Sequence, residues 1–370
     1  MIYLDHAATT PLRKEAFNVM LPYFAEHAAN ANALYAEGRK ARSAIDQARG
    51  QIADAIHAKS SEIYFTGGGS ESDNWALFGV MRALEGKKHI ITTQIEHHAI
   101  LNACAALESS GYDVTYVPVD QWGRVSPQDI EKAIRPETGL VSVMAANNEV
   151  GTIQPIAEIA RIAHANGVLM HTDAVQAVGH IPIDVAALNV DLLSMAAHKF
   201  YGPKGIGALY IKNGVKITNL VYGGEQERGL RAGTENTPAI VGMGEALALA
   251  CSEMDGAAQQ IVHLRDLLEN EIMQRMPEAI VNGDREKRLP GTLHVTFPGA
   301  DTNMLLMRLD MEGIAVSAGS ACAAGARERS HVLEAMHVPS GADVRFSLGT
   351  DNDETQIRQT VDTLYRILNG

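Results

Sequence analysis

The sequence is poor in cysteine and in positive charge, and each shortage excludes a class of protein. Its three cysteines, Cys104, Cys251 and Cys322, are too widely and irregularly spaced for a disulfide framework or a metal-binding knuckle. Lysine and arginine number 31 against 44 aspartate and glutamate residues, and this net charge of −13 argues against direct nucleic-acid binding. We therefore expect a protein of the reducing cytoplasm.

Long apolar runs and a secretion signal are also missing. No stretch approaches the ~20 apolar residues of a membrane-spanning helix. Residues 1–6 lack the basic and apolar regions of a signal peptide. We expect no membrane association. The composition, 46% apolar and 20% charged, is that of a globular protein, and a chain of 370 residues predicts two domains at roughly 100–200 residues each.

Short apolar runs alternate with helical patterns between residues 62 and 211. Ser126 before Pro127 marks one helix start, and Pro155 opens another helix that ends at residues 166–167. This alternation predicts an α/β fold, in which a large domain (13–255) has a mostly parallel, roughly seven-stranded sheet flanked by helices. The candidate strands are 63–66, 89–93, 113–117, 140–145, 168–172, 191–196 and 207–211.

The pattern changes after residue 236. An alanine-rich helical stretch runs towards residue 276, with a possible interruption at Gly256. The rest of the chain predicts a smaller α+β domain, formed by residues 256–370 together with residues 1–12. Its elements are a strand at 292–297, a helix at 302–312, a short apolar segment at 314–316, a helix at 331–336, a strand at 344–348 and a last helix from 353.

Lys199 is the first candidate for chemistry. It comes directly after the apolar run 190–195, with His198 before it and the glycine-containing stretch 201–205 behind it. An amine in a pocket can form a Schiff base with a carbonyl cofactor, above all pyridoxal phosphate. A lone lysine of this kind is more often an ordinary turn residue, so other segments must supply the remaining contacts.

A phosphate site is indicated by residues 65–73, which join a strand to a helix through Gly67, Gly68 and Gly69. Glycines let backbone N–H groups approach an anion, and the helix N-terminus adds a positive dipole end. Ser70 either caps this helix or contacts the phosphate. The spacing matches neither a dinucleotide-binding fingerprint nor a P-loop.

Polar residues follow several predicted strands. Asp173, Asn148 and His97 each come just past one strand, and parallel strands deliver such residues to one edge of the sheet. A carboxylate at Asp173 either holds a pyridine nitrogen protonated or caps a helix. Gln176 is placed to reach the ring hydroxyl, and His97 to stack on a flat cofactor or to move protons.

Cys322 and Arg345 are the candidates for the substrate. Cys322 lies among the small residues of 317–326, which suits an accessible nucleophile, although a buried cysteine in a turn fits the same residues. Cys104 and Cys251 lie in apolar helical stretches and are expected to pack. Arg345 alternates with apolar neighbours, and its guanidinium either binds a substrate carboxylate or pairs with Asp343 or another acid.

Nine segments, taken in order, resemble the cysteine desulfurases of the NifS/IscS type, which are PLP-dependent fold type I enzymes of the class V aminotransferase group. The resemblance covers nearly the whole chain. It implies removal of sulfur from L-cysteine, with L-alanine as product, in the service of iron–sulfur cluster biosynthesis. The segments are 3–11, 68–74, 96–97, 147–151, 173–176, 198–199, 231–236, 317–322 and 345–349.

The resemblance assigns a role to each candidate. It matches Lys199 with the Schiff-base lysine, Cys322 with the cysteine that carries the persulfide, and His97 with the imidazole stacked on the cofactor. The other implied contacts are Gly69, Ser70 and His198 to the phosphate, Asp173 to the pyridine nitrogen, Asn148 and Gln176 to the ring oxygen side, Asn148 and Arg345 to the substrate, and Thr234 to the phosphate of a neighbouring subunit.

The role of Thr234 implies a homodimer. The family serves sulfur-acceptor proteins, and an iron–sulfur scaffold, a tRNA-thiolation enzyme and a DNA-modification enzyme are all open as acceptors. Three positions depart from the family pattern: Tyr35 replaces a histidine, and Ala196 and Gly67 each replace a serine. A selenocysteine lyase or another class V PLP enzyme is an alternative, as is a non-catalytic binding subunit for a sulfur acceptor.

Overall fold

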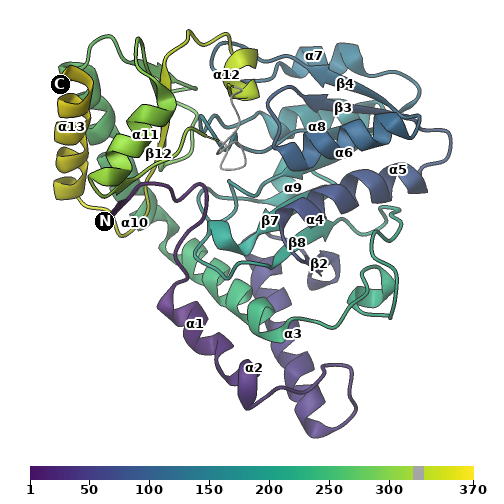
Figure 1. Cartoon of the computed structure of the whole chain (residues 1–370). Coiled ribbons are helices and arrows are strands. Elements are labelled where there is room, and N and C mark those ends of the chain that lie inside the picture. Colours follow the sequence, from purple (N-terminus) through teal and green to yellow (C-terminus); the bar gives the residue numbers. More distant parts are fainter. Residues whose placement is uncertain (320–328) are drawn as a thin grey trace.

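A seven-stranded sheet forms the centre of the structure, a computed structural model that describes residues 1–319 and 329–370 (Figure 1). The strands are β2 (Ile63–Thr66), β3 (His89–Thr93), β4 (Asp113–Val117), β5 (Thr138–Ser142), β6 (Leu169–Asp173), β7 (Leu192–Ala196) and β8 (Gly207–Ile211). They lie in the order β2-β8-β7-β6-β5-β3-β4, and all neighbours are parallel except β8, which is antiparallel to β2 and β7. The predicted α/β class with a mostly parallel sheet is confirmed.

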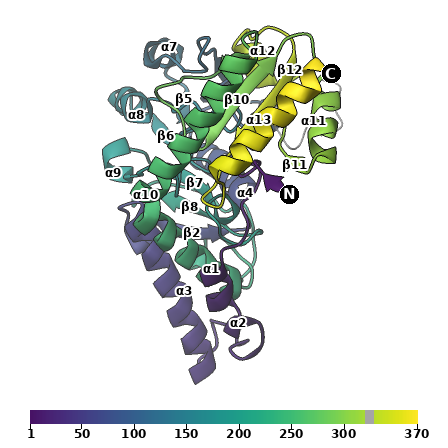
Figure 2. The same ribbon diagram turned by 90° about the vertical axis from the view of Figure 1, so that its left-hand side faces the viewer.

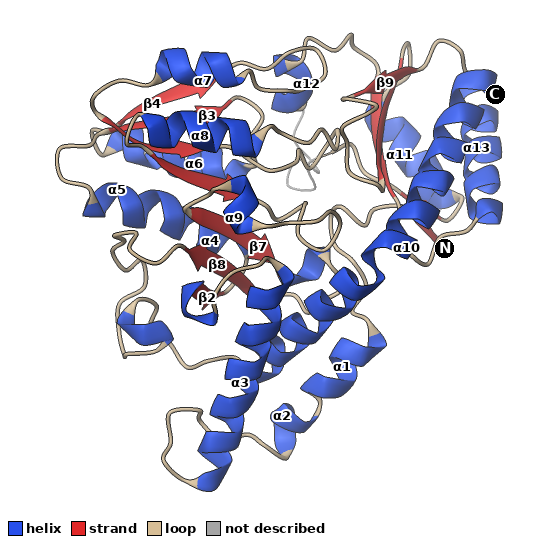
Figure 3. Ribbon diagram, turned by 180° about the vertical axis from the view of Figure 1, so that it is seen from behind, coloured by secondary structure: helices blue, strands red, loops and turns tan. Residues whose placement is uncertain are grey.

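Helices cover both faces of this sheet (Figure 3). As predicted, Ser126 caps a helix that has Pro127 in its first turn, and a second helix ends before residues 166–167. The elements are α3 (Ala36–Ala55), η1 (Ser60–Glu62), α4 (Gly69–Asn74), the π-helical turn η2 (Trp75–Gly79), α5 (Val80–Ala83), α6 (His98–Ser109), α7 (Pro127–Ala133), α8 (Ile156–Ala165), α9 (Val185–Leu188), η3 (Ala197–Lys199) and η4 (Glu227–Gly229).

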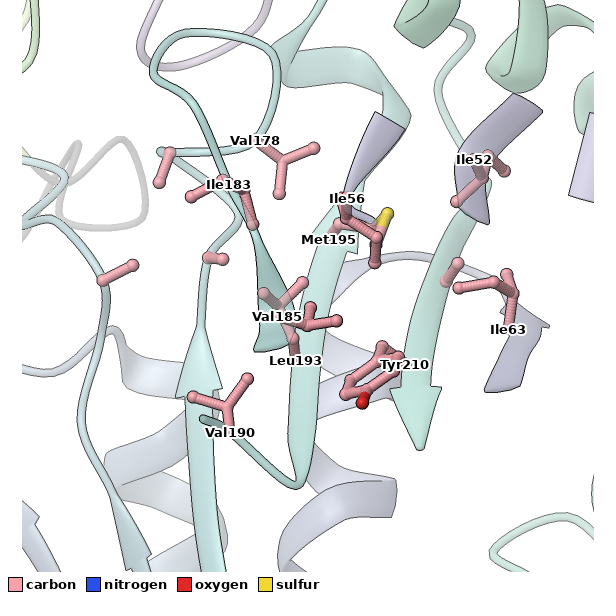
Figure 4. Packing of buried hydrophobic residues seen from close by; sticks show 14 of the residues in the cluster. Ile52, Ile56, Ile63, Val178, Ile183, Val185, Val190, Leu193, Met195 and Tyr210 are labelled. Carbon is pink, nitrogen blue, oxygen red and sulfur yellow. The ribbon is translucent and has the colours of Figure 1, made fainter. Parts of the chain in front are cut away.

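The strands are buried on both faces, which explains their continuous apolar sequences. Successive side chains of a strand point to opposite faces, so Leu192 of β7 packs in one apolar layer and Leu193 in the other. Leu140 and Val141 of β5 alternate in the same way. The layer of Leu193 includes Ile56, which follows α3, and Figure 4 shows this packing.

A second, smaller group of strands stands beside the main sheet. β9 (Ile280–Asn282), β10 (Thr292–Phe297) and β12 (Ala342–Ser347) form an antiparallel sheet, and β1 (Ile2–Tyr3) pairs in parallel with β11 (Ile314–Ala315). The sequence pattern does not indicate β9, which has only three residues. The helices here are α11 (Thr302–Met311) and α13 (Glu354–Asn369), whereas α12 (His331–Ala335) packs against Ile95 and Met144 of the large-sheet loops.

Two predicted strands begin two residues away from the observed ones. β12 begins two residues before the expected 344, because its pairing with β10 extends over the full length of that strand. β5 covers 138–142 instead of 140–145, because its pairing with β3 begins at Thr138 and ends at Val141. Beyond it, the N–H groups of Val143 and Ala145 donate to the carbonyls of His171 and Asp173.

One long helix, α10 (Thr237–Arg275), belongs to both groups (Figure 2). Its first half, at Met243 and Leu247, packs in the core of the large sheet, whereas Leu264 and Leu268 pack in the core of the small one. The interruption expected at Gly256 is wrong, because this glycine is exposed in a continuous helix. Two short helices, α1 (Lys14–Met20) and α2 (Pro22–Ala25), precede α3. In the described part of the chain, α10 and every other helix are too short or too polar to cross a membrane.

Candidate active site

A cavity of about 230 Å³ lies where β3, β5, β6 and β7 end. Most of the residues predicted from the sequence line it, namely Gly69, Ser70, His97, Asn148, Asp173, Gln176, His198, Lys199 and Arg345. The rest of the wall is formed by Ala7, Ala8, Asp73, Met144, Ala146, Val175, Ala196 and Gly319. Residues far apart in the sequence thus share one cavity.

The parallel sheet explains this convergence. Asp173 is the last residue of β6, Lys199 lies in η3 directly after β7, His97 follows β3 and Asn148 follows β5. All four strands run in the same direction, so their carboxyl ends meet at one edge. The sheet therefore brings an amine, a carboxylate, an imidazole and an amide together.

The N-terminus of α4 forms one end of the cavity. Gly68 precedes the helix with a φ of +152°, a conformation that side chains disfavour. A Cβ on Gly69 would lie 2.8 Å from Cγ2 of Val175, so only glycine fits this close approach. Ser70 lies inside the helix and does not cap it, which corrects one of the two alternatives for this residue. This end offers N–H groups and a positive dipole to an anion.

His198 adds a neutral imidazole to the cavity wall. Burial, with Lys199 and Lys204 nearby, lowers the pKa of His198 to about 4. Its Nδ1 lies 3.3 Å from the hydroxyl of Thr9. Near neutral pH this ring can donate a hydrogen bond to an anion without adding charge.

Lys199 is held by the N-terminal segment of the chain. Its Nζ donates to the backbone carbonyl of Ala8 at 2.9 Å and also to that of Ala7. The backbone carbonyl of Lys199 in turn lies 2.7 Å from Nε2 of His180. The amine is therefore fixed on the cavity wall by groups on both sides.

Asp173 faces the same space from β6. Burial raises the pKa of Asp173, whereas His97 and Lys199 favour its charged form. Its Oδ1 accepts from the backbone N–H of Val175 at 2.9 Å. Gln176 donates its side-chain amide to the carbonyl of Ala7 at 3.0 Å, so it also ties the N-terminal segment to the cavity.

His97 caps the helix that follows it. Its Nδ1 accepts from the backbone N–H of Ala99 at 3.1 Å, and burial lowers the pKa of the ring. A neutral, oriented imidazole at this position can stack on a planar ligand.

Two further buried carboxyl groups, those of Asp73 and Glu96, lie close to Asp173. The sequence analysis assigned no role to either of them. Burial raises the pKa of Asp73 well above its usual range, and the nearby charge of Asp173 adds to this effect. Burial also raises the pKa of Glu96 to about 8. Asp73 lies within the quoted glycine segment and Glu96 precedes His97, so their positions, though not their environments, were visible in the sequence.

Arg345 is buried with only 2% of its side chain exposed. Its Nη2 donates to Oδ1 of Asp5 at 2.9 Å, and its Nη1 donates to the carbonyl of Asn148 at 2.7 Å. The predicted acid pair thus exists, with Asp5 as the acid. Within the described residues the Nε of Arg345 has no hydrogen-bond partner, so a donor is left for a ligand.

Two predicted site residues lie elsewhere. Thr234 is exposed between η4 and α10 and does not line the cavity of its own subunit. Cys322 falls in 320–328, outside the described residues. Burial raises the pKa of Cys104 to about 12 and also raises that of Cys251, which makes both poor nucleophiles.

Comparison with known proteins places this geometry in context. Residues 2–360 match the family model of class V aminotransferases. The chain is 49% identical over 371 residues to the cysteine desulfurase IscS of Dictyoglomus turgidum, covering 99% of this chain and 94% of the relative. The structure matches a NifS-like protein with a TM-score of 0.94 at 39% identity, covering 100% of this chain and 99% of the other. It also matches the structure described as SspA in complex with cysteine, with a TM-score of 0.84 at 39% identity. That match covers 95% of this chain and 99% of the other.

Proposed function

Since the chain belongs to the class V aminotransferase family, we propose that it is a pyridoxal phosphate-dependent cysteine desulfurase. It converts L-cysteine to L-alanine and forms a persulfide on Cys322. One observation carries the proposal: Lys199, Asp173 and the N-terminus of α4 face a single cavity. These three features supply what a phosphorylated pyridine aldehyde requires, namely an amine, a carboxylate and an anion site.

The residues present fit this cofactor. The close approach at Gly69 leaves the helix N–H groups uncovered for a phosphate, with Ser70 and His198 beside them. The carboxylate of Asp173 would hold a proton on the pyridine nitrogen, and the neutral ring of His97 would stack on the cofactor. Asn148 and Gln176 would meet its ring oxygen. When bound, pyridoxal phosphate supplies an electron-withdrawing ring that stabilises negative charge at the substrate α-carbon.

Arg345 would bind the carboxylate of L-cysteine. A guanidinium recognises a carboxylate through two N–H donors, and the Nε of Arg345 is unpaired within the described residues. The Nη1 of Arg345 rests on the carbonyl of Asn148, which fixes the plane of the guanidinium.

Lys199 is the group placed to carry a proton at the substrate α-carbon. Its Nζ lies on the cavity wall near Asp173 and His97, where an amine can accept or return a proton. His97 is the second candidate, because its Nδ1 accepts from the N–H of Ala99 and its neutral ring therefore carries a proton on Nε2 that it can donate.

The transfer of sulfur from the substrate to Cys322 needs no separate oxidant. The thiolate of Cys322 bonds to the substrate sulfur, and the carbon–sulfur bond of the substrate breaks with its electron pair left on carbon. That carbon takes a proton and becomes the methyl group of alanine. Cys322 keeps the sulfur as a persulfide for an acceptor protein, whether an iron–sulfur scaffold, a tRNA-thiolation enzyme or a DNA-modification enzyme. Such thiol chemistry fits the reducing cytoplasm.

Substitution of Cys322 by serine tests the function. Alanine formation from L-cysteine should fall to near background in Cys322→Ser, while the visible cofactor band and the spectral response to cysteine are retained. Cys251→Ser is the matched control and should keep the activity of the wild type. Alanine formation near the wild-type rate in Cys322→Ser would refute the proposal and point to a lyase that needs no protein thiol.

A further inference from the structure

Glu96 is a fully buried carboxyl group for which the proposed mechanism has no role. It lies between β3 and α6, directly before His97, which lines the cavity. A carboxyl group without access to water is costly to the fold unless its oxygens are hydrogen-bonded. The partners of Glu96 therefore show what this residue holds in place.

The side chain of Glu96 joins the loop after β3 to the end of β5. Its Oε1 accepts from the hydroxyl of Thr93, the last residue of β3, at 2.6 Å. Both of its oxygens accept from the backbone N–H of Met144 at 3.1 Å. Met144 lies two residues past β5 and, like His97, lines the cavity. One buried carboxyl group thus connects two parts of the cavity wall.

The backbone around Glu96 is anchored to other elements as well. The carbonyl of Ile95 accepts from the side-chain amide of Asn147 at 3.0 Å. The carbonyl of Glu96 accepts from Nε2 of His331, the first residue of α12, at 3.0 Å. These contacts and the carboxyl group together fix the course of the loop up to His97.

His97 stands at the point where this anchored loop enters α6. It has the extended backbone of an N-cap residue, and its Nδ1 accepts from the backbone N–H of Ala99 at 3.1 Å. That hydrogen bond orients the ring relative to the helix. The place of the ring in the cavity depends in addition on where the loop carries the backbone of His97, and the loop is held by Glu96.

We propose that Glu96 is a positioning residue for His97, whose imidazole it places against the cofactor by locking the loop after β3 onto the end of β5. Glu96 is not one of the described residues that line the cavity, so it acts through His97 and not on a ligand. The inference rests on the proposed function in one respect, namely the stacking of His97 on pyridoxal phosphate.

A double-mutant cycle on the dissociation constant of pyridoxal phosphate, measured by absorbance titration, tests the inference. Glu96→Ala removes the connection between the two loops, and we expect the constant to rise by about threefold or more. In a His97→Ala background the same change should have no further effect, because the ring that Glu96 positions is already gone. A carboxyl group that only stabilises the fold would weaken binding by the same factor in both backgrounds, and that result overturns the inference.

Two further variants serve as references. Burial raises the pKa of Glu96 to about 8, so the group is protonated near pH 7 and Glu96→Gln matches its size and charge. The amide oxygen can still accept from the N–H of Met144, and the affinity of the wild type should be retained. Glu62→Ala is the matched control, because Glu62 is a buried acid at the other end of β2 that also accepts from backbone N–H groups, those of Lys59 and Asn213. It should leave cofactor binding unchanged.

Visible circular dichroism, divided by the absorbance of the bound cofactor, reports the setting of the cofactor and not the stability of the fold. Glu96→Ala should change this ratio in the same direction as His97→Ala, and a ratio equal to that of the wild type would contradict the inference. If Glu96→Ala does not fold, Thr93→Val removes one partner of the carboxyl group and carries the same cycle. A chain that binds no pyridoxal phosphate refutes the proposed function, whereas unchanged affinity in cofactor-bound Glu96→Ala refutes this inference alone.

Discussion

At the scale of single residues, the lysine of the cavity depends on a segment nearly 200 positions away. Nζ of Lys199 is hydrogen-bonded to the carbonyls of Ala7 and Ala8. Backbone carbonyls are acceptors only, so they orient the amine without competing for the covalent bond that a carbonyl cofactor requires. This arrangement makes Lys199 the lysine that we expect to carry the cofactor.

Borohydride reduction of the purified protein should fix the mass of the cofactor on the peptide that contains Lys199. Lys199→Ala should lose the visible band of the bound cofactor, because among the described residues that line the cavity no other lysine can replace its Nζ. Lys204→Ala, an exposed lysine five positions on, should keep the band. Peptide mass spectrometry and absorbance measure both effects, and label on any other lysine would contradict the assignment.

The sequence was sufficient to predict much of the cavity wall, because His97, Asn148 and Lys199 come after parallel strands that meet at one edge. It could not reveal the ion pair of Arg345 with Asp5, since 340 positions separate the two residues. The raised pKa of Asp73 was also hidden, because it arises from burial and from Asp173 rather than from neighbours in the sequence.

At the scale of elements, the junction of β2 and α4 shows how glycine serves the cavity. A methyl group on Gly69 would press against Val175, which follows Asp173 by two residues. A larger side chain at Gly69 would therefore disturb the cofactor site rather than the hydrophobic core.

Gly69→Ala should raise the dissociation constant of pyridoxal phosphate at least tenfold, because the Cβ covers the helix N–H groups and displaces Val175. Dialysis followed by absorbance titration measures the constant. Gly50→Ala in α3 is the control: nothing lies within 4 Å of its Cβ, so cofactor binding should not change. The free energy of unfolding of that variant should exceed that of the wild type by ~0.5–1 kcal/mol, since alanine favours a helix interior. Equal cofactor affinity in both variants would contradict this account.

Element positions were also predictable to within a few residues, with α10 as the instructive exception. Glycine disfavours a helix interior by about 1 kcal/mol, which is why an interruption at Gly256 was expected. Apolar residues on both sides, among them Leu247 and Leu264, anchor the helix in two cores and outweigh this cost. Only tertiary packing supplies that information.

At the scale of the whole molecule, buried titratable groups set how stability changes with pH. Burial raises the pKa of Glu96 to about 8. The contribution of this group to the stability of the fold is therefore complete below about pH 4.5 and is lost as the pH rises through 8. Burial lowers the pKa of His171 to about 3, so its contribution is complete above about 6.5 and is lost as the pH falls towards 3.

Glu96→Gln and His171→Gln should therefore shift the pH profile in opposite directions. Relative to the wild type, the free energy of unfolding of Glu96→Gln should increase between pH 5 and 8. That of His171→Gln should increase as the pH falls from 6.5 to 4.5, in both cases by ~1.4 kcal/mol per pH unit at most. Urea unfolding at several pH values measures this. His263→Gln, an exposed histidine, is the control, and parallel profiles for all three variants would refute the assignment.

The family resemblance of Thr234, which is exposed and away from the cavity of its own subunit, leads us to expect a homodimer with shared sites. Sedimentation equilibrium should give about twice 39.8 kDa. Thr234→Val should weaken cofactor binding without changing this mass, because only a contact to the partner's phosphate is lost. A monomer with full activity at assay concentration would contradict the shared site.

The pairing of β1 with β11 has a consequence for synthesis of the chain on the ribosome. Ile2 emerges about 310 residues before its partner Ile314, which at the usual rate of elongation means roughly 15 to 60 s of waiting. The same N-terminal segment supplies the carbonyls that hold Lys199. A nascent chain that has completed its large sheet therefore still lacks β11, which pairs with the start of this segment, and Arg345, which pairs with Asp5, so sulfur chemistry begins only after the last strands have been translated.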